Sequence, residues 1–333
     1  MPGILPVRTI TWEELRGKKI GVDFSNCAYQ FLSSIRQPDG TPLMDSKGNI
    51  TSHLQGLFSR TLNLINKGIK ICYIFDGRPP LLKQYEREER EHRKRVAEER
   101  LQKAMDEEDI ESMGKYSKQT ARLTSQMVSE AKELVKAMGL PVIQSPQESD
   151  AQGAFMTERD DLFAFATSDA DSLMHGCPRT IVNLTLAEKR KIPGGNFVYI
   201  KPQLIELKDV LKHLKINQDQ LIVMGILTGT DYNPKGVYGI GPKKALNLVQ
   251  QYKKFDKLFS EIDTDFDWKQ IYAIFKSMAV MKNYQLKWQE LDEESVLRIL
   301  VDKHEFSEER VKRLLEKNKQ EKENKKQKSL NEF

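Results

Sequence analysis

Residues 163–177 read "FAFATSDADSLMHGC", an apolar run that ends in two aspartates, Asp169 and Asp171. Residues i and i+2 of an extended strand lie on the same face of a sheet. Two carboxylates on one face repel each other unless a positive charge lies between them. A turn would explain one of these aspartates but not both, so the stretch predicts a buried strand whose end faces a cation.

Other short apolar runs resemble this one, and they occupy residues 18–25, 70–77, 140–149, 180–186 and 197–201. Because they lack strict alternation, they are typical of strands buried on both faces, as in a parallel sheet covered by helices. Helical patterns lie between them at 52–68 and 125–139, and the second ends in a glycine suited to a helix C-cap. The alternation of strands and helices predicts an α/β fold with a mainly parallel sheet.

The composition excludes several classes of protein. The chain has 333 residues, enough for one large domain with insertions or two small ones. It lacks a long apolar window and the apolar core of a signal peptide, so we expect a soluble intracellular protein without a membrane partner. Its 3 cysteines and 5 histidines are scattered, which argues against a disulfide framework or a zinc site. Any metal would therefore have oxygen ligands.

The net charge of +5 is unevenly distributed. Residues 310–328 hold nine Lys/Arg against three Asp/Glu, a local charge of +6. Segregated charge suggests a polyanionic partner, although a basic tail is also a common solubilising device. From residue 317 on, the sequence is too polar to pack against a core, and we predict a flexible tail there.

Carboxylates follow the predicted strands at the end where α/β sheets bind ligands. They are Asp23, Asp76, Glu148, Asp150, Asp169 and Asp171, with Asp231 as a seventh in "LTGTDYN". Any one alone would be a turn former or a helix N-cap, but so many in one crevice would repel each other strongly. Oxygen-only ligands fit Mg²⁺ or Mn²⁺, and two such ions about 4 Å apart catalyse in-line displacement at a phosphodiester. We predict such a site, with Asp169 and Asp171 facing each other across a metal.

Two segments indicate contact with nucleic acid. In "GVYGIGPKKAL" (236–246), glycines precede a helix that begins near Pro242. Such a turn presents backbone N–H groups and the positive end of a helix to a phosphate, and reads the backbone and not the bases. The residues concerned are Gly236, Gly239, Gly241, Lys243 and Lys244.

The second segment is a highly charged insertion from about residue 80 to 123. It carries bases at the spacing i, i+4, i+7 and i+11, namely Lys83, Arg87, Arg90 and Lys94. This spacing makes a basic stripe on a helix that would contact phosphates, while the alternative is a solvated helix with internal ion pairs to Glu86 and Glu91. Tyr29 lies six residues beyond Asp23 and would either stack on a base or pack in the core.

At this point the sequence resembles a known family. The stretches are "VDFSNCAYQFLSSIRQPDGTPLMDSKGNITSHLQGLFSRT", "YIFDGRPPLLK", "GTDYNPKGVYGIGPKKAL" and "FSEERV". They closely resemble the flap endonucleases of the structure-specific 5′-nuclease family, and most of all the archaeal form. The resemblance implies a PIN-like core with a helical arch at about 78–123 and a helix-two-turn-helix module at about 218–258, in one nuclease domain of residues 1–316.

The resemblance also implies an activity. In such enzymes two divalent ions hydrolyse the phosphodiester at the base of a 5′ flap, with accompanying 5′-exonuclease activity, in Okazaki-fragment maturation and repair. This places the protein in the cytoplasm and nucleoid of an archaeon or the nucleus of a eukaryote, as a monomer on branched DNA. The first metal cluster of the family is matched by Asp23, Asp76, Glu148 and Asp150, and the second by Asp169, Asp171 and Asp231, the last of these through water.

Contacts with DNA are implied in the same way. Lys83 and Arg90 match the arch residues that position the scissile phosphate, and Tyr29 matches the aromatic that stacks on the adjacent nucleotide. Thr51 and His53 lie in the segment that receives a short 3′ flap. The turn from Gly236 to Gly241 matches the one that holds a monovalent cation such as K⁺ against the downstream phosphates.

Three positions depart from the family pattern. Asp150 stands where the family usually has glutamate, so the metal would shift or be reached through water. The start "MPGIL" is shorter than usual and lacks the Met-Gly that lies near the active site. The end, "QKSLNEF", resembles a peptide that binds a sliding clamp of the PCNA type, but it stops one residue before the second aromatic, so we expect reduced affinity. Its matching residues are Gln327, Leu330 and Phe333.

Two other functions remain to be weighed against flap cleavage. A related nuclease of the same family would prefer bubbles, gaps or Holliday junctions, but bubble-cutting relatives carry a much larger spacer than the insertion of about 45 residues in this chain. A catalytically weakened DNA-binding or clamp-associated protein would explain Asp150 and the altered start. All seven acidic positions carry carboxylates, which favours the enzyme.

Overall fold

A computed structural model of the chain describes residues 5–37, 39–107, 109–117, 119–186, 188–191 and 196–331. In this part of the chain a seven-stranded sheet has the order β1-β9-β6-β5-β2-β3-β4. Strands β6, β5, β2, β3 and β4 run parallel, while β9 runs antiparallel to β6 and β1. The strands are β1 (Arg8–Thr9), β2 (Lys19–Asp23), β3 (Lys70–Phe75), β4 (Val142–Gln144), β5 (Ala164–Ala166), β6 (Arg179–Val182) and β9 (Gln203–Glu206).

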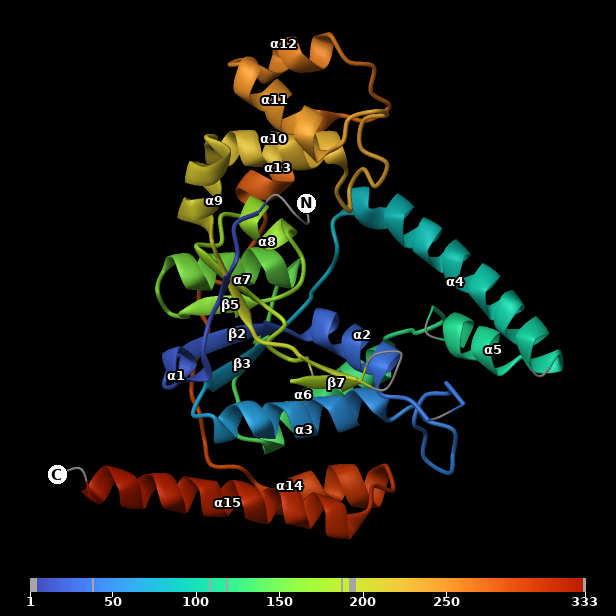
Figure 1. The fold of residues 1–333 in the computed structure, drawn as a ribbon, viewed down its shortest axis with the longest axis vertical. Helices are drawn as coiled ribbons and strands as arrows, with labels where there is room; N and C mark the ends of the chain where they lie inside the picture. Colours follow the sequence, from blue (N-terminus) through green and yellow to red (C-terminus); the bar gives the residue numbers. More distant parts are fainter. Residues whose placement is uncertain are drawn as a thin grey trace.

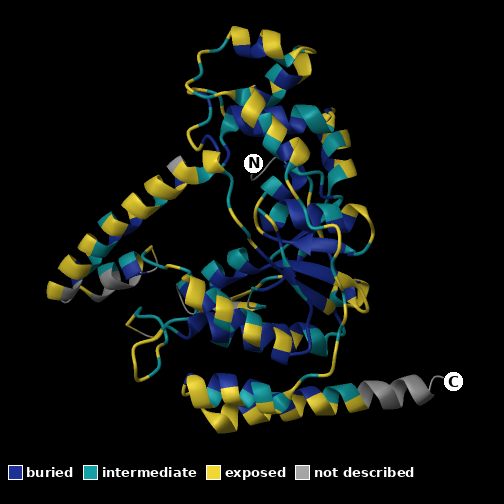
Figure 2. Ribbon diagram, turned by 180° about the vertical axis from the view of Figure 1, so that it is seen from behind, coloured by how far each residue is buried: buried dark blue, intermediate teal, exposed yellow. Residues whose placement is uncertain are grey.

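Helices cover both faces of this sheet (Figure 1). One face packs against α2 (Phe24–Ser34), α3 (Ser52–Asn66) and α6 (Ser125–Ala137), and α7 (Ser149–Glu158) contributes to the core on the other face. Side chains of β3 alternate between the two cores, because Tyr73 and Phe75 belong to the first and Ile74 to the second. The central strands β2, β3 and β5 are accordingly buried apart from the first residues of β2 and β3 (Figure 2), which confirms the α/β fold.

A second helical unit lies at the end of the sheet where the parallel strands finish. Its core joins residues of several helices around Leu221, Ile222 and Leu227. The helices are α8 (Asp171–Met174), α9 (Leu207–Leu214), α10 (Gln218–Thr228), α11 (Pro242–Gln251), α12 (Phe255–Ser260) and α13 (Trp268–Ser277). The predicted module at 218–258 thus begins with α10 and reaches into α12.

The charged insertion forms two helices that extend away from the body of the molecule (Figure 1). They are α4 (Gln84–Asp106) and α5 (Ile110–Ser117), preceded by the short 3₁₀ helix η1 (Leu81–Lys83). Most of α4 is exposed, as Figure 2 shows. The last residue of α5 contacts the loop between α2 and α3, because the Ser117 hydroxyl donates to the Gly40 carbonyl at 2.8 Å.

One predicted strand lies outside the main sheet. Residues 197–201 supply β8 (Phe197–Tyr199), which pairs antiparallel only with β7 (Lys189–Lys191) among the described strands. The three residues of β8 are exposed, so the expectation of burial on both faces is wrong here. The two strands form a separate pair outside the seven-stranded sheet, and it is the latter whose two faces are covered by helices.

The C-terminal segment also differs from the expectation. Helix α15 (Glu308–Asn331) continues through the predicted boundary at residue 317, so residues 317–331 are helical and not an irregular tail. Polar side chains hold it: Lys319 pairs with Glu293 at 2.8 Å and Lys322 with Glu290 at 3.2 Å, both in or near α14 (Glu293–Leu297). Of the clamp-like peptide, Gln327 and Leu330 lie in α15 and Phe333 lies outside the described residues. No described helix is both long and apolar enough to cross a bilayer.

The contact between α2 and α3 makes a test of this packing. A Cβ atom added to Gly56 would lie 2.3 Å from Cγ of the buried Phe31 ring. Gly56→Ala should therefore destabilise the protein by about 1–3 kcal/mol through overpacking, although alanine in an unconstrained helix would add about 1 kcal/mol of stability. Urea unfolding measures the change, and Phe31→Leu should cost less in the Gly56→Ala background than in the wild type. A stabilising Gly56→Ala would contradict this packing.

Candidate active site

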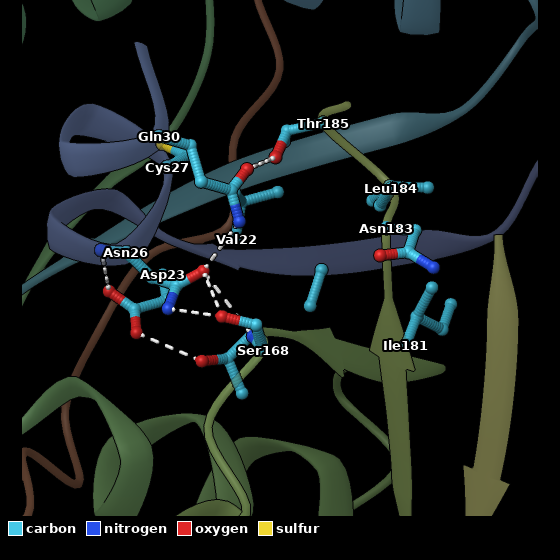
Figure 3. Close-up of a pocket in the computed structure, with 12 residues that line it drawn as sticks. Val22, Asp23, Asn26, Cys27, Gln30, Ser168, Ile181, Asn183, Leu184 and Thr185 are labelled. Atoms are coloured by element: carbon cyan, nitrogen blue, oxygen red, sulfur yellow. Dashed lines mark hydrogen bonds between the residues drawn. The ribbon is translucent and has the colours of Figure 1, made fainter. Parts of the chain in front are cut away.

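Asp23 lies at the junction of β2 and α2, and it is 5% exposed. Its Oδ1 accepts from the Asn26 N–H at 3.0 Å, and its Oδ2 accepts from the Thr167 hydroxyl at 3.1 Å. Figure 3 shows Asp23 beside Asn26 and Ser168 at the start of α2. Asp23 is thus the N-cap residue of α2. Because β2 ends at Asp23, the same carboxylate also lies at the end of the sheet with the other acids.

Two further acids enter from the start of α7. Glu148 is the N-cap residue of this helix and Asp150 lies in its first turn. Asp76, one residue beyond β3, accepts from the Ser149 N–H at 2.8 Å through Oδ1. The positive end of α7 favours negative charge at this place, so the helix start and the strand end bring three carboxylates together.

Asp169 and Asp171 are arranged differently from the prediction. Strand β5 ends at Ala166, so neither aspartate belongs to a strand, and the expectation of one shared strand face is wrong. Instead the chain turns: the Asp169 N–H donates to the Thr167 hydroxyl at 3.2 Å, and the Asp171 N–H donates to Asp169 Oδ1 at 3.1 Å. Turns of this kind arise because short polar side chains capture nearby backbone N–H groups. Asp171 then begins α8.

Lys83 reaches into this acidic group from the base of the insertion. Its Nζ lies 2.6 Å from Glu148 Oε1 and 2.7 Å from Asp231 Oδ2. The second oxygen of Glu148 accepts from the Tyr232 hydroxyl at 2.7 Å. Asp231 therefore lies close to Glu148, and it is brought there by the helical unit, whose core includes the neighbouring Tyr232.

The carboxylates act on one another electrostatically. Burial and then the charge of Asp76 raise the pKa of Asp23 to about 7. Burial raises the pKa of Asp150 well above its usual range, with added effects from Asp23 and Asp169. The same causes, burial first and then Asp169 and Asp231, raise the pKa of Asp171. The pKa of each of these three aspartates is raised by carboxylates from other segments of the chain, so the structure brings the predicted acids into one group.

The group suits divalent cations by its chemistry. Every donor is a carboxylate oxygen, and Asp150 Oδ1 is buried without a hydrogen-bond partner although its side chain as a whole is only partly buried. Among the described residues, no three His, Cys, Asp or Glu side chains have the arrangement of a ready-made metal site. Lys83 lies against two of the acids, where its ammonium stands in for a cation between Glu148 and Asp231. The residues present therefore fit oxygen-coordinated ions such as Mg²⁺.

The other bases of the stripe have separate environments. Arg90 Nη2 pairs with Glu86 Oε1 at 2.7 Å, within α4. Lys94 is 9% exposed, and its Nζ lies 5.5 Å from the centre of the Tyr29 ring. Arg87 is exposed. Lys94 also pairs with Glu91 at 3.3 Å, so Arg90 and Lys94 make the internal ion pairs that the alternative expected. Of the other two bases, Lys83 meets the acids and Arg87 faces solvent.

The glycine turn follows α10 and leads into α11. Gly236 and Gly239 have φ values of +56° and +72°, and Gly241 is the N-cap residue of α11, followed by exposed Lys243 and Lys244. A Cβ atom on Gly236 would lie 2.6 Å from the Thr228 carbonyl carbon, so glycine allows the turn to approach α10. Thr51 and His53 are buried at the start of α3, next to the loop between α2 and α3.

Sequence reasoning missed the residues that hold the acids in place. Asn26 and Ser168 are joined by their side chains at 2.7 Å and connect α2 to the turn after β5. Thr167 and Tyr232 each donate a hydroxyl hydrogen bond to a carboxylate of the group. A signal was present, because Thr167, Ser168 and Tyr232 are sequence neighbours of predicted acids in "TSDAD" and "GTDYN".

Comparison with known proteins identifies the family. Residues 3–97 match the XPG N-terminal domain and residues 139–231 match the XPG I-region. The chain is 48% identical over 315 residues to flap endonuclease 1 of Pyrococcus abyssi, covering 94% of this chain and 92% of that protein. It is also 48% identical over 319 residues to flap endonuclease 1 of Pyrococcus furiosus, with the same coverage. Among solved structures, flap endonuclease-1 from Methanococcus jannaschii superimposes with a TM-score of 0.77 at 38% identity, covering 97% of this chain and 98% of that one.

These relatives span nearly the whole chain at high identity, and they confirm the resemblance found in the sequence. The chain therefore belongs to the flap endonuclease 1 family of structure-specific nucleases, enzymes that hydrolyse phosphodiester bonds.

Proposed function

We propose that this protein removes 5′ flaps from branched DNA by hydrolysing the phosphodiester at the flap base, with accompanying 5′-exonuclease activity. Membership of the flap endonuclease 1 family gives the reaction class. The observation that supports the site most directly is the group of carboxylates whose burial and mutual charge raise the pKa values of Asp23, Asp150 and Asp171. Such a group requires positive charge, and a metal-dependent phosphodiesterase supplies it.

The carboxylates would hold two divalent ions, with Mg²⁺ as our first candidate and Mn²⁺ as the alternative. The proposed ligands are Asp23, Asp76, Glu148 and Asp150 in one cluster and Asp169, Asp171 and Asp231 in the other. When bound, such ions lower the pKa of a water molecule and stabilise charge on the phosphate. The N–H groups and hydroxyls around Asp23 and Glu148 fix these two ligands, which is what a precise metal site needs.

Lys83 and Arg90 act on the scissile phosphate in this proposal. Both lie near the base of the arch, and Lys83 already points into the acidic group. A cation placed where negative charge develops lowers the barrier more than it strengthens docking. Tyr29, which packs beside Lys94 opposite the arch, would stack on the adjacent nucleotide.

Binding of the duplex would use surfaces away from the chemistry. The turn from Gly236 to Gly241, with Lys243 and Lys244, would contact backbone phosphates, with a monovalent cation such as K⁺ between them. Arg87, which is exposed, would add a phosphate contact from the arch, and Lys94 would add one after moving away from Tyr29 and Glu91. Thr51 and His53 would border the place that receives a 3′ flap.

The cellular role follows from the substrate. We assign the protein to Okazaki-fragment maturation and repair inside the cell, working as a monomer, because one chain supplies every acid of the group. Residues Gln327, Leu330 and Phe333 would bind a sliding clamp of the PCNA type. Since Gln327 and Leu330 lie in α15, binding would require the end of this helix to unwind or present one face.

The activity is tested with a 5′-labelled double-flap DNA in Mg²⁺. We expect one main cut close to the flap junction, abolished by EDTA, with little cutting of plain duplex or single strand. Asp169→Asn should slow cleavage by about 100-fold or more while flap affinity is retained, because it removes one preorganised charge from the site. Asp302→Asn, an exposed acid in η2 (Arg298–Lys303), is the matched control and should cleave normally. Unchanged cleavage by Asp169→Asn would contradict the metal assignment.

The raised pKa of Asp23 predicts how the metal-free protein responds to pH. Its folded-state pKa of about 7 exceeds the value of 3.8 for a free side chain, so between these values the folded state binds more protons than the unfolded state. Stability in EDTA should therefore fall as the pH rises from about 5 to about 8. Thermal unfolding measures this, and Asp23→Asn should flatten the fall while keeping an oxygen for the N-cap. Added Mg²⁺ should raise the melting temperature more at high pH. A difference in melting temperature between the wild type and Asp23→Asn that did not change with pH would contradict the raised pKa of Asp23.

A further inference from the structure

Lys83 connects the arch to the acidic group through two short ion pairs. Its Nζ lies 2.6 Å from Glu148 Oε1 and 2.7 Å from Asp231 Oδ2, and its side chain is 20% exposed. Burial alone would lower the pKa of this ammonium, but the charges of Glu148 and Asp231 raise it, so the group stays positively charged. An ammonium held this way neutralises part of the repulsion among the carboxylates.

The surrounding contacts leave Lys83 as a local source of positive charge for Glu148 and Asp231. The other oxygen of Glu148 is satisfied by the neutral Tyr232 hydroxyl at 2.7 Å. Arg90, the next proposed cation of the arch, pairs with Glu86 of the same helix. Lys83 therefore contacts the acidic group directly, whereas Arg90 makes its ion pair within the arch and interacts with Asp231 only at longer range.

We propose that Lys83 is the built-in counter-ion of the metal-free site, and that a divalent cation bound at Glu148 and Asp231 displaces it. The inference rests on the proposed function, because it takes these two acids as metal ligands. The ammonium and a divalent ion use the same oxygens, and two positive charges at such separations repel strongly in a partly buried site. One therefore excludes the other.

This exchange links metal binding to the arch. Lys83 is the last residue of η1 and directly precedes α4. Its release from Glu148 and Asp231 therefore removes the two ion pairs that hold the base of the arch against the acids. The freed ammonium is then available to a phosphate of the DNA. By linkage, a DNA phosphate that draws Lys83 away from the acids strengthens divalent binding by the same factor by which the divalent ion strengthens binding of that phosphate.

Equilibrium binding of Mn²⁺ to the full-length protein, followed by electron paramagnetic resonance, tests the proposal without any turnover. Lys83→Met keeps the length of the side chain and removes the competing charge, so it should bind Mn²⁺ about tenfold more tightly than the wild type. Lys103→Met removes the same charge from α4, the helix that follows Lys83, at a side chain that is 76% exposed and pairs with Glu107, and should leave the affinity unchanged.

The possible outcomes distinguish failure of the counter-ion role of Lys83 from failure of the metal site itself. Equal or weaker Mn²⁺ binding by Lys83→Met, with normal binding by the other two proteins, overturns the counter-ion role and leaves the metal site standing. Absence of Mn²⁺ binding in all three proteins overturns the proposed metal site and this inference with it.

A second measurement uses the wild type alone, so it tests the proposal even if Lys83→Met does not fold. Acetylation by an amine-reactive ester, read by mass spectrometry, should be slow at Lys83 in EDTA because its amine is held by two carboxylates. Saturating Mn²⁺ should raise the rate at Lys83 several-fold and leave Lys103 unchanged. The same slow rate at Lys83 with and without Mn²⁺ would refute displacement.

Discussion

The mutual repulsion of carboxylates gathered at one end of a parallel sheet is the constraint on which this structure depends. Burial and neighbouring charges raise the pKa values of Asp23, Asp150 and Asp171, so the metal-free protein holds these acids at a cost in free energy. Each local feature of the site offsets part of that cost. Backbone N–H groups at helix starts, the hydroxyls of Thr167 and Tyr232, and the Lys83 ammonium all supply positive charge or hydrogen bonds to carboxylate oxygens.

The architecture follows from where these groups come from. Parallel strands end at the same edge, and α2, α7 and α8 all begin there, so one edge gathers acids and helix N-termini together. The helical unit of α10 and α11 adds Asp231 and Tyr232, and the arch adds Lys83. The site is therefore complete only when core, helical unit and arch are folded in contact. The identity shared with flap endonuclease 1 of the Pyrococcus species extends over all three parts.

Much of this could be predicted from the sequence, for definite reasons. Buried parallel strands have a continuous apolar pattern, and acids at strand ends must converge if the sheet is parallel, so Asp23, Asp76 and Glu148 followed from position alone. Residues 197–201 have the same apolar pattern but pair with a basic strand, and pattern alone does not reveal the partner. The turn at Asp169 and the helix beyond residue 317 depend on side-chain hydrogen bonds and ion pairs that no periodicity records. The ion pairs of Lys83 belong to the same class, since they join residues far apart in the sequence.

The central claim is that this acidic group exists to bind divalent cations. The most direct measurement is anomalous X-ray diffraction from crystals of the full-length protein grown with Mn²⁺. The account predicts anomalous peaks among the carboxylates, bordered by Asp150 and Asp171, with the Lys83 ammonium moved away from Glu148. Crystals without an anomalous peak among these acids, or with Mn²⁺ bound only elsewhere, would contradict it.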